Sequence, residues 1–334
     1  MRLAEVGGLG SFALLGPGFA AGGWTLLRGL RESADAPDLV FADFETPGSA
    51  ARRYRAERRE TVAVDLMAPA SAPRVTLRAA GYAEAVGRIR EAIAAGDVYQ
   101  VCHTVRADVV GPDGAALLAG MCACGVPRFA AWVRLPTGEE FVSASPELFF
   151  ETSGREVHTE PMKGTARGDS GAVLEASAKD RAELAMITDL LRNDLTPVCR
   201  PRSVRVRCDR RTLVLPYAVQ TVSDIVGELR EDATPLDVLA ALHPGGSVTG
   251  APKDAALAII RELESGPRGA YCGALGLCRG ERSVFSLLIR TASRAADGWI
   301  YGVGSGIVWD SDADAELAEL RVKLGALWSA TPSS

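Results

Sequence analysis

Segments with strand and helix periodicity follow one another along this chain without a regular strand–helix–strand repeat. Such an irregular mixture favours an α+β fold over a doubly wound parallel sheet. After a first helix that begins near Tyr82 and stops at Gly96, the apolar spacing predicts helices at 177–195, 235–242, 253–264 and 313–328. It predicts strands at 61–66, 98–106, 128–134, 140–143, 148–152, 275–279, 283–292 and 299–303.

One of these strands, at 98–106, has an unusually polar face. Successive side chains of a strand point to opposite faces, so Gln100, Cys102 and Thr104 share one side. That set is too polar for an ordinary core. We therefore expect it to line a cavity.

Composition and charge exclude several classes of protein. The chain has 334 residues, of which 47% are hydrophobic and 24% charged, as is normal for a soluble globular protein. Its net charge of −5 argues against nucleic acid or an anionic membrane as a partner. The seven cysteines have no repeating spacing, which favours reduced thiols over a disulfide framework.

The uncharged stretch at 6–27 has the length of a membrane span. Its glycines and Pro17 break a helix, however, and Glu5 beside Arg2 does not suit a signal peptide. Short strands joined by turns are the better interpretation. We expect a cytoplasmic protein with no membrane partner.

Three glutamates occupy unusual positions on the predicted helices. Glu183 falls on the apolar stripe formed by Ile187 and Leu190, where an unpaired charge is costly. Glu316 and Glu319 project side by side at i,i+3 from the last helix. Clustered carboxylates suit a hard cation such as Mg²⁺. Salt bridges, or an exposed glutamate pair, are the alternatives that spacing alone leaves open.

Two glycine-rich stretches and one lysine complete the inventory. "HPGGSVTGAPK" (243–253) runs from a loop into a helix, and "GVGSGI" (302–307) lies between a strand and the final helix. Such loops expose backbone N–H groups that bind carboxylates or phosphates. Lys163 lies in the turn-like "PMKGTARG" (161–168), where it is either a solvated surface charge or a residue held for chemistry.

Taken together, these stretches resemble the chorismate-utilising enzymes, which include anthranilate, aminodeoxychorismate, isochorismate and salicylate synthases. The resemblance covers about 81–323 and rests on "GDVYQVCHTVR", "SPELFF", "PMKGTARG", "KDRAELAMITDLLRND", "HPGGSVTGAPK", "RGAYCGALG", "LLIRTA" and "GVGSGIVWDSDADAELAEL". It implies a four-layer α-β-β-α sandwich. A short N-terminal part (1–75) would contribute strands to this sandwich, and 76–330 would form the chorismate-binding catalytic domain.

The resemblance also implies roles for particular residues. Mg²⁺ would bind Glu183, Glu316 and Glu319 and hold the ring carboxylate of chorismate. Lys163 would attack the ring as its uncharged amine, with Glu147 of "SPE" as the acid for the leaving hydroxyl. The substrate-binding residues implied are Gln100, Thr249, Gly250, Tyr271, Arg290, Gly304, Ser305, Gly306 and Lys323.

Two positions separate the reactions of this family. Isochorismate and salicylate synthases carry a lysine base on the early strand, where this chain has Gln100, so addition of water is disfavoured. Anthranilate synthases usually carry alanine in the turn motif, where this chain has Lys163. The pairing resembles aminodeoxychorismate synthase component I, on the p-aminobenzoate and folate route.

Several alternatives and departures go with this interpretation. Gln220 occupies a place where anthranilate synthases have a histidine, and "GTARG" is one residue shorter than is usual in the family. The sequence has no G-x-C-x-G nucleophile elbow, so a separate glutamine amidotransferase is expected to supply ammonia. The competing functions are anthranilate or 2-amino-2-deoxyisochorismate synthase component I, and a catalytically silent chorismate-binding scaffold.

Overall fold

The computed structural model describes residues 1–21, 23–66, 72–166, 178–215 and 218–325. Its helices are α1 (Leu3–Gly7), α2 (Tyr82–Ala95), α3 (Gly114–Met121), α5 (Ala178–Leu195), α6 (Pro235–Leu242), α7 (Gly246–Thr249), α8 (Lys253–Leu263) and α9 (Ala313–Gly325), with short 3-10 helices at Gly48–Ala50 and Thr196–Val198. Its strands are β1 (Phe12–Leu15), β2 (Trp24–Glu32), β3 (Leu39–Ala42), β4 (Arg52–Val62), β5 (Arg74–Arg78), β6 (Gln100–Val110), β7 (Phe129–Arg134), β8 (Glu140–Ser145), β9 (Leu148–Ser153), β10 (Glu156–Thr159), β11 (Met162–Ala166), β12 (Arg205–Leu215), β13 (Ala218–Glu228), β14 (Gly250–Ala251), β15 (Ala274–Arg279), β16 (Arg282–Leu287), β17 (Thr291–Ala295) and β18 (Gly298–Ile307).

The strands form one continuous antiparallel ladder. It runs from β5 through β6, β18, β17, β8, β7, β1, β2, β4, β3, β15, β16, β9, β10 and β13 to β12. Two more strands join it at its ends, because β14 pairs with β6 and β11 pairs with β13. The N-terminal strands β1 to β4 lie in the middle of this ladder and connect its two halves.

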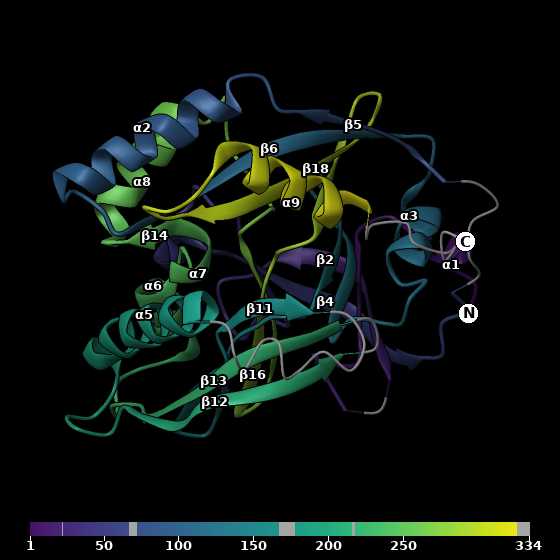
Figure 1. Ribbon diagram of the computed structural model, residues 1–334. Coiled ribbons are helices and arrows are strands. Elements are labelled where there is room, and N and C mark those ends of the chain that lie inside the picture. Colours follow the sequence, from purple (N-terminus) through teal and green to yellow (C-terminus); the bar gives the residue numbers. More distant parts are fainter. Residues whose placement is uncertain (22, 67–71, 167–177, 216–217, 326–334) are drawn as a thin grey trace.

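Helices cover the two ends of the ladder (Figure 1). The helix α5 packs against β11 and β13 in one half, and α2, α8 and α9 pack against β6 and β18 in the other. A separate apolar cluster joins side chains from strands of both halves, with Phe19, Phe41, Phe129 and Phe141 among its largest members. This arrangement confirms the α+β prediction and agrees with α-β-β-α layers.

Local sequence explains how these helices begin and end. α2 ends at Gly96, whose left-handed backbone (φ 83°) lets its N–H donate to the carbonyls of Ala92 and Ile93. Thr234 and Asp237 form a reciprocal capping box at the start of α6. In the described residues, no helix is both long and apolar enough to cross a membrane.

Several predicted boundaries were wrong. The strand expected at 283–292 is two strands, β16 and β17, because the chain turns between them at Arg290, which has a φ of 51°. The stretch 302–307, expected as a loop, is part of β18. β4 ends at Val62, so the strand expected at 61–66 barely exists, and the helix expected at 313–328 is described only to Gly325.

Candidate active site

Glycines at alternate positions of β18 leave one face of that strand without side chains. A β-carbon on Gly302 would overlap the ring of Tyr271, and one on Gly306 would overlap the side-chain amide nitrogen of Gln100. Gly304 is similarly close to Thr104, at 2.7 Å from its Cγ2. The glycines are therefore needed because other side chains lie directly against the strand. Tyr271, Gln100 and Thr104, which are far apart in the sequence, all lie against this glycine face of β18, which forms the floor of the site.

The same strand has an edge that is open in the described residues. β18 pairs with β6 from Trp299 to Ile307, but with β17 only as far as Tyr301. Beyond that point, backbone groups on the second edge can bind something other than a strand. One of them is already engaged, since the Lys323 ammonium donates to the carbonyl of Gly304 at 2.9 Å.

Gln100 brings an unpaired polar atom to this floor. Its side chain is buried, and its Oε1 has no hydrogen-bond partner in the described parts of the chain. A buried amide oxygen without a partner is rare in proteins, so it is available to a bound molecule. Gly250, with a φ of 137°, lies against the carbonyl of Gln100, and the Thr249 hydroxyl donates to the carbonyl of Gly245 at 3.0 Å.

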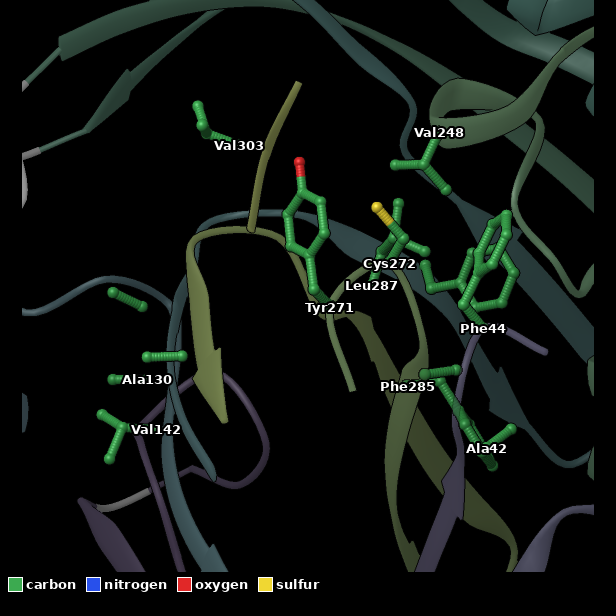
Figure 2. Packing of buried hydrophobic residues seen from close by; sticks show 14 of the residues in the cluster. Ala42, Phe44, Ala130, Val142, Val248, Tyr271, Cys272, Phe285, Leu287 and Val303 are labelled. Carbon is green, nitrogen blue, oxygen red and sulfur yellow. The ribbon is translucent and has the colours of Figure 1, made fainter. Parts of the chain in front are cut away.

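Tyr271 and Arg290 lie near the other end of β18. Figure 2 shows the Tyr271 hydroxyl pointing away from Phe285 and Ala42. Burial raises the pKa of this hydroxyl well above its ordinary value, so it stays a neutral hydrogen-bond donor. Arg290 is near enough to Tyr301 to influence the pKa of that phenol, which burial raises to about 12.

Lys163 is a half-buried residue of β11 and faces α5. Its ammonium nitrogen lies 3.5 Å from a carboxylate oxygen of Glu183, and each side chain is 15% exposed. The contact forms because α5 packs across β11 and presents its polar positions to it. The structure thus pairs the predicted nucleophile with a predicted metal ligand.

Glu147 is a buried carboxyl group close enough to interact with Lys163. Burial raises its pKa to about 7, while a hydrogen bond from Ser247 and the charge of Lys163 both act to lower it. The Ser247 hydroxyl on α7 donates to Glu147 Oε1 at 3.0 Å. A carboxyl group with a pKa near neutrality can donate a proton at physiological pH.

The three predicted metal ligands are arranged on facing elements. Glu183 on α5 lines a cavity of about 400 Å³ together with Val308 and Asp310, which precede α9. On α9, Glu316 is buried and accepts a hydrogen bond from Ser311 at 2.8 Å, and exposed Glu319 forms an ion pair with Lys323 at 2.8 Å.

These glutamates suit a hard cation chemically. All of them offer carboxylate oxygens, the ligand type that Mg²⁺ prefers, and Glu316 is almost fully buried. The oxygens of Glu183, Glu316 and Glu319 are not all within 4.8 Å of one another, however. A metal ion would therefore need small movements of these side chains to bind all three.

The described residues do bring one other group of potential ligands together, His158, Glu160 and Asp224. Arginine side chains already neutralise its carboxylates. Arg211 pairs with both Asp224 and Glu160, and Arg128 also pairs with Glu160. This cluster is a buried charge network on the β10–β13 side of the sheet and does not need a cation.

Two residues near the site were not singled out as site residues from the sequence. Ser247 lies within the motif at 243–253, but nothing in that motif indicates its bond to Glu147. Cys102 shares the polar face of β6 with Gln100. Burial raises the pKa of its thiol, and the charges of Arg268, Lys163 and Lys323 act in the opposite direction.

Comparisons with known proteins place the chain in a family. Residues 40–329 match the family of chorismate binding enzymes. The chain is 38% identical over 260 residues to anthranilate synthase component 1 1 of Haloarcula marismortui, covering 75% of this chain and 53% of that protein. It is 39% identical over 259 residues to aminodeoxychorismate synthase component 1 of Escherichia coli, covering 74% of this chain and 56% of that protein.

A solved structure shows the same fold over nearly the whole chain. The menaquinone-specific isochorismate synthase MenF of Escherichia coli matches with a TM-score of 0.80 at 18% identity, covering 97% of this chain and 90% of that one. The chain belongs to the family of chorismate binding enzymes. It spans about half the length of the two curated relatives just described.

Proposed function

We propose that this chain is the synthetase component of an aminodeoxychorismate synthase. It would convert chorismate and ammonia into 4-amino-4-deoxychorismate and water. The observation that carries the proposal is the pair of Lys163 and Glu147, an amine and a buried acid whose pKa is about 7 and is influenced by the charge of that lysine. Gln100, which cannot act as a base, supports amination over the addition of water.

The bonding changes can be assigned to side chains of this chain. The uncharged amine of Lys163 attacks ring C2, the ring double bonds shift, and the C4–oxygen bond breaks. Glu147 gives its proton to the departing oxygen, which leaves as water. Ammonia then bonds to C4 and gives a proton to the Glu147 carboxylate, the double bonds shift back, and Lys163 leaves C2 as its amine. Lysine and acid are thus regenerated.

The remaining residues would hold and orient the substrate. Tyr271 and Arg290 are suited to the pyruvyl carboxylate as a neutral donor and a cation, and Gly304 and Gly306 on the open edge of β18 add backbone N–H groups. The Ser305 hydroxyl forms a hydrogen bond with that of Tyr82. Thr249, Gly250 and Lys323 would form the rest of the substrate-binding surface. Glu183, Glu316 and Glu319 would hold Mg²⁺, which supplies positive charge for the ring carboxylate.

Ammonia would come from a separate glutamine amidotransferase. Several relatives of this chain are named components of a synthase, which supports a partner subunit. Free ammonium should replace the partner in the test tube, because ammonia itself is the nucleophile of the second step. A cytoplasmic location and a role on the p-aminobenzoate and folate route belong to the same proposal.

Product identification tests the proposal directly. The purified chain is incubated with chorismate, MgCl₂ and ammonium chloride. The products are separated by chromatography and identified by mass spectrometry. The 4-amino product is expected, and Lys163→Ala should abolish it. Anthranilate or a 2-amino product would support the rival that the anthranilate synthase relatives suggest. Binding of chorismate without any product would support the scaffold alternative.

A further inference from the structure

A second cavity, of about 270 Å³, is lined by residues of α2, α8 and β6. The helices α2 and α8, which lie side by side in Figure 1, both contribute residues to its wall, and the strand β6 forms its floor. The two helices are tied together across it by an ion pair between Arg88 and Glu262. The residues of its wall that matter here are Gly81, Glu84, His103, Arg106 and Glu264.

His103 contributes a buried imidazole with an unsatisfied nitrogen. The residue is 4% exposed, and its Nδ1 has no hydrogen-bond partner among the described residues. Its ring lies over Tyr82, with centroids 5.5 Å apart, and therefore faces the first turn of α2. The Glu264 carboxylate is 3.9 Å from Nδ1, beyond hydrogen-bond distance. Buried polar atoms are normally satisfied, which points to a bound molecule.

The ring of His103 is neutral at physiological pH, because burial lowers its pKa. The 3.9 Å approach to Glu264 is thus not an ion pair. Glu264 is satisfied elsewhere, since Arg268 donates to both of its oxygens and the N–H of Thr104 donates to one. A ligand rather than Glu264 is the better partner for the imidazole.

Two positive groups at the cavity, the start of α2 and Arg106, form no ion pair in the described residues. The N-cap of α2 is Gly81, which has a φ of 76° and offers no capping side chain, so the helix terminus can bind an anion. Arg106 donates to the carbonyl of Pro267 but forms no ion pair in the described parts of the chain. Arg78 and Arg88, by contrast, are each paired, with Asp108 and Glu262.

Glu84 limits the charge of the anion. It lies in the first turn of α2 and on the wall of the same cavity, so it repels a second negative charge. A singly charged carboxylate fits this balance better than a dianionic phosphate. The volume is below the range of drug-sized ligands, which limits the molecule to a few carbon atoms.

We propose that this cavity binds a small hydroxycarboxylate. Its carboxylate lies at the start of α2 beside Arg106, and its hydroxyl group forms the missing hydrogen bond with Nδ1 of His103. No residue assigned to the candidate active site belongs to this set, so the inference does not depend on the proposed reaction.

Histidine-selective NMR can test this, because the chain has only three histidines. Protein labelled with ¹⁵N in its imidazoles is titrated with L-lactate, and His103→Gln assigns the relevant signal. We expect saturable shifts at His103 and unchanged signals for His158 and His243. Propionate, which lacks the hydroxyl, should bind about fivefold more weakly. Arg106→Gln should weaken lactate binding about tenfold, and Arg58→Gln, an exposed arginine of β4, should not change it.

Glu84→Gln provides an independent variant if Arg106→Gln does not fold. It removes the repelling charge and should tighten lactate binding severalfold. Three outcomes would overturn the proposal. These are no saturable shift of His103 up to 50 mM L-lactate, equal shifts of all three histidines, or tighter binding of inorganic phosphate than of lactate.

Discussion

The ammonium group of Lys163 on β11 lies 3.5 Å from the carboxylate of Glu183 on α5, and both side chains are mostly buried. If Glu183 also binds Mg²⁺, the lysine and the metal ion share one carboxylate. Two cations close to the same anion compete, because each reduces the attraction that the other experiences. The pair therefore links the proposed nucleophile to the proposed metal site.

Removing the lysine charge should strengthen metal binding. In Lys163→Met, Glu183 loses its ion-pair partner. The gain should be about 1 kcal/mol, which is roughly a fivefold lower Kd for Mg²⁺. Calorimetric titration of the purified protein measures it, and Glu183→Gln serves as the control that should lose affinity. Unchanged or weaker Mg²⁺ binding in Lys163→Met would show that the two cations do not share this carboxylate.

The pH dependence of amination should report on Glu147. Its pKa of about 7 leaves it protonated below neutrality, so the rate of C4–oxygen cleavage should fall as pH rises through 7. Glu147→Gln should lower the rate by roughly a hundredfold and remove this limb of the profile. The measurement is kcat for chorismate between pH 5.5 and 8.5. If kcat of the variant still fell in the same way as pH rises through 7, a group other than Glu147 would be responsible for the titration.

The same carboxyl group should make folding stability depend on pH. Burial raises the pKa of Glu147 from 4.5 to about 7, so its protonated form is the favourable one in the folded state. Its contribution is complete below the unfolded pKa and is lost as pH rises to 7, on the order of 3 kcal/mol. Urea unfolding at pH 5 and pH 8 should show this loss in the wild type and not in Glu147→Gln. Ser247→Ala is the matched variant, and it should shift the loss to higher pH, since the Ser247 hydrogen bond lowers this pKa.

The glycines of β18 should tolerate no side chain where Gln100 lies. Gly306→Ala would force the Gln100 amide away from the strand. We expect kcat/KM for chorismate to fall about tenfold or more, with little further effect of Gln100→Ala in the double variant. Gly87→Ala is the control, because a β-carbon on this residue of α2 meets no atom within 4 Å. It should stabilise the helix by about 0.5–1 kcal/mol and leave kinetics unchanged.

Much of the fold could be predicted because apolar periodicity was clear. α6 has the boundaries expected for it, and α2, α5 and α8 differ from expectation by a residue or two at most. The strands β12 and β13 were missed altogether. β12 alternates basic and apolar residues with no buried face until Leu215, so it has no pattern of a buried strand. It forms through its pairing with β13, which local sequence does not encode.

The candidate site, too, could be predicted only in part. Motif positions gave the identities of Lys163, Glu147 and Glu183, whose roles remain predictions. The contacts among them depend on how α5 lies over β11 and how α7 lies against Glu147. The expectation of a loop at 302–307 failed because glycines suggested a turn, whereas in β18 they make room for Gln100 and Tyr271. Such a reason is visible only in three dimensions.

A last prediction concerns Arg268, whose side chain links the strand β6 to the helix α7. Its guanidinium donates to the carbonyls of Cys102 on β6 and Val248 on α7, at 2.7 and 2.6 Å, and to Glu264. Arg268→Met would leave a buried carboxylate uncompensated, so unfolding free energy should fall by about 3–5 kcal/mol. Urea denaturation measures it, with Arg58→Met, a change on an exposed side chain, expected within about 0.5 kcal/mol of wild type. The double variant with Glu264→Gln should recover part of the loss, since the unpaired charge is then removed. If the single and double variants were equally destabilised, the ion pair would not be the cause, and the two carbonyl contacts would carry the effect instead.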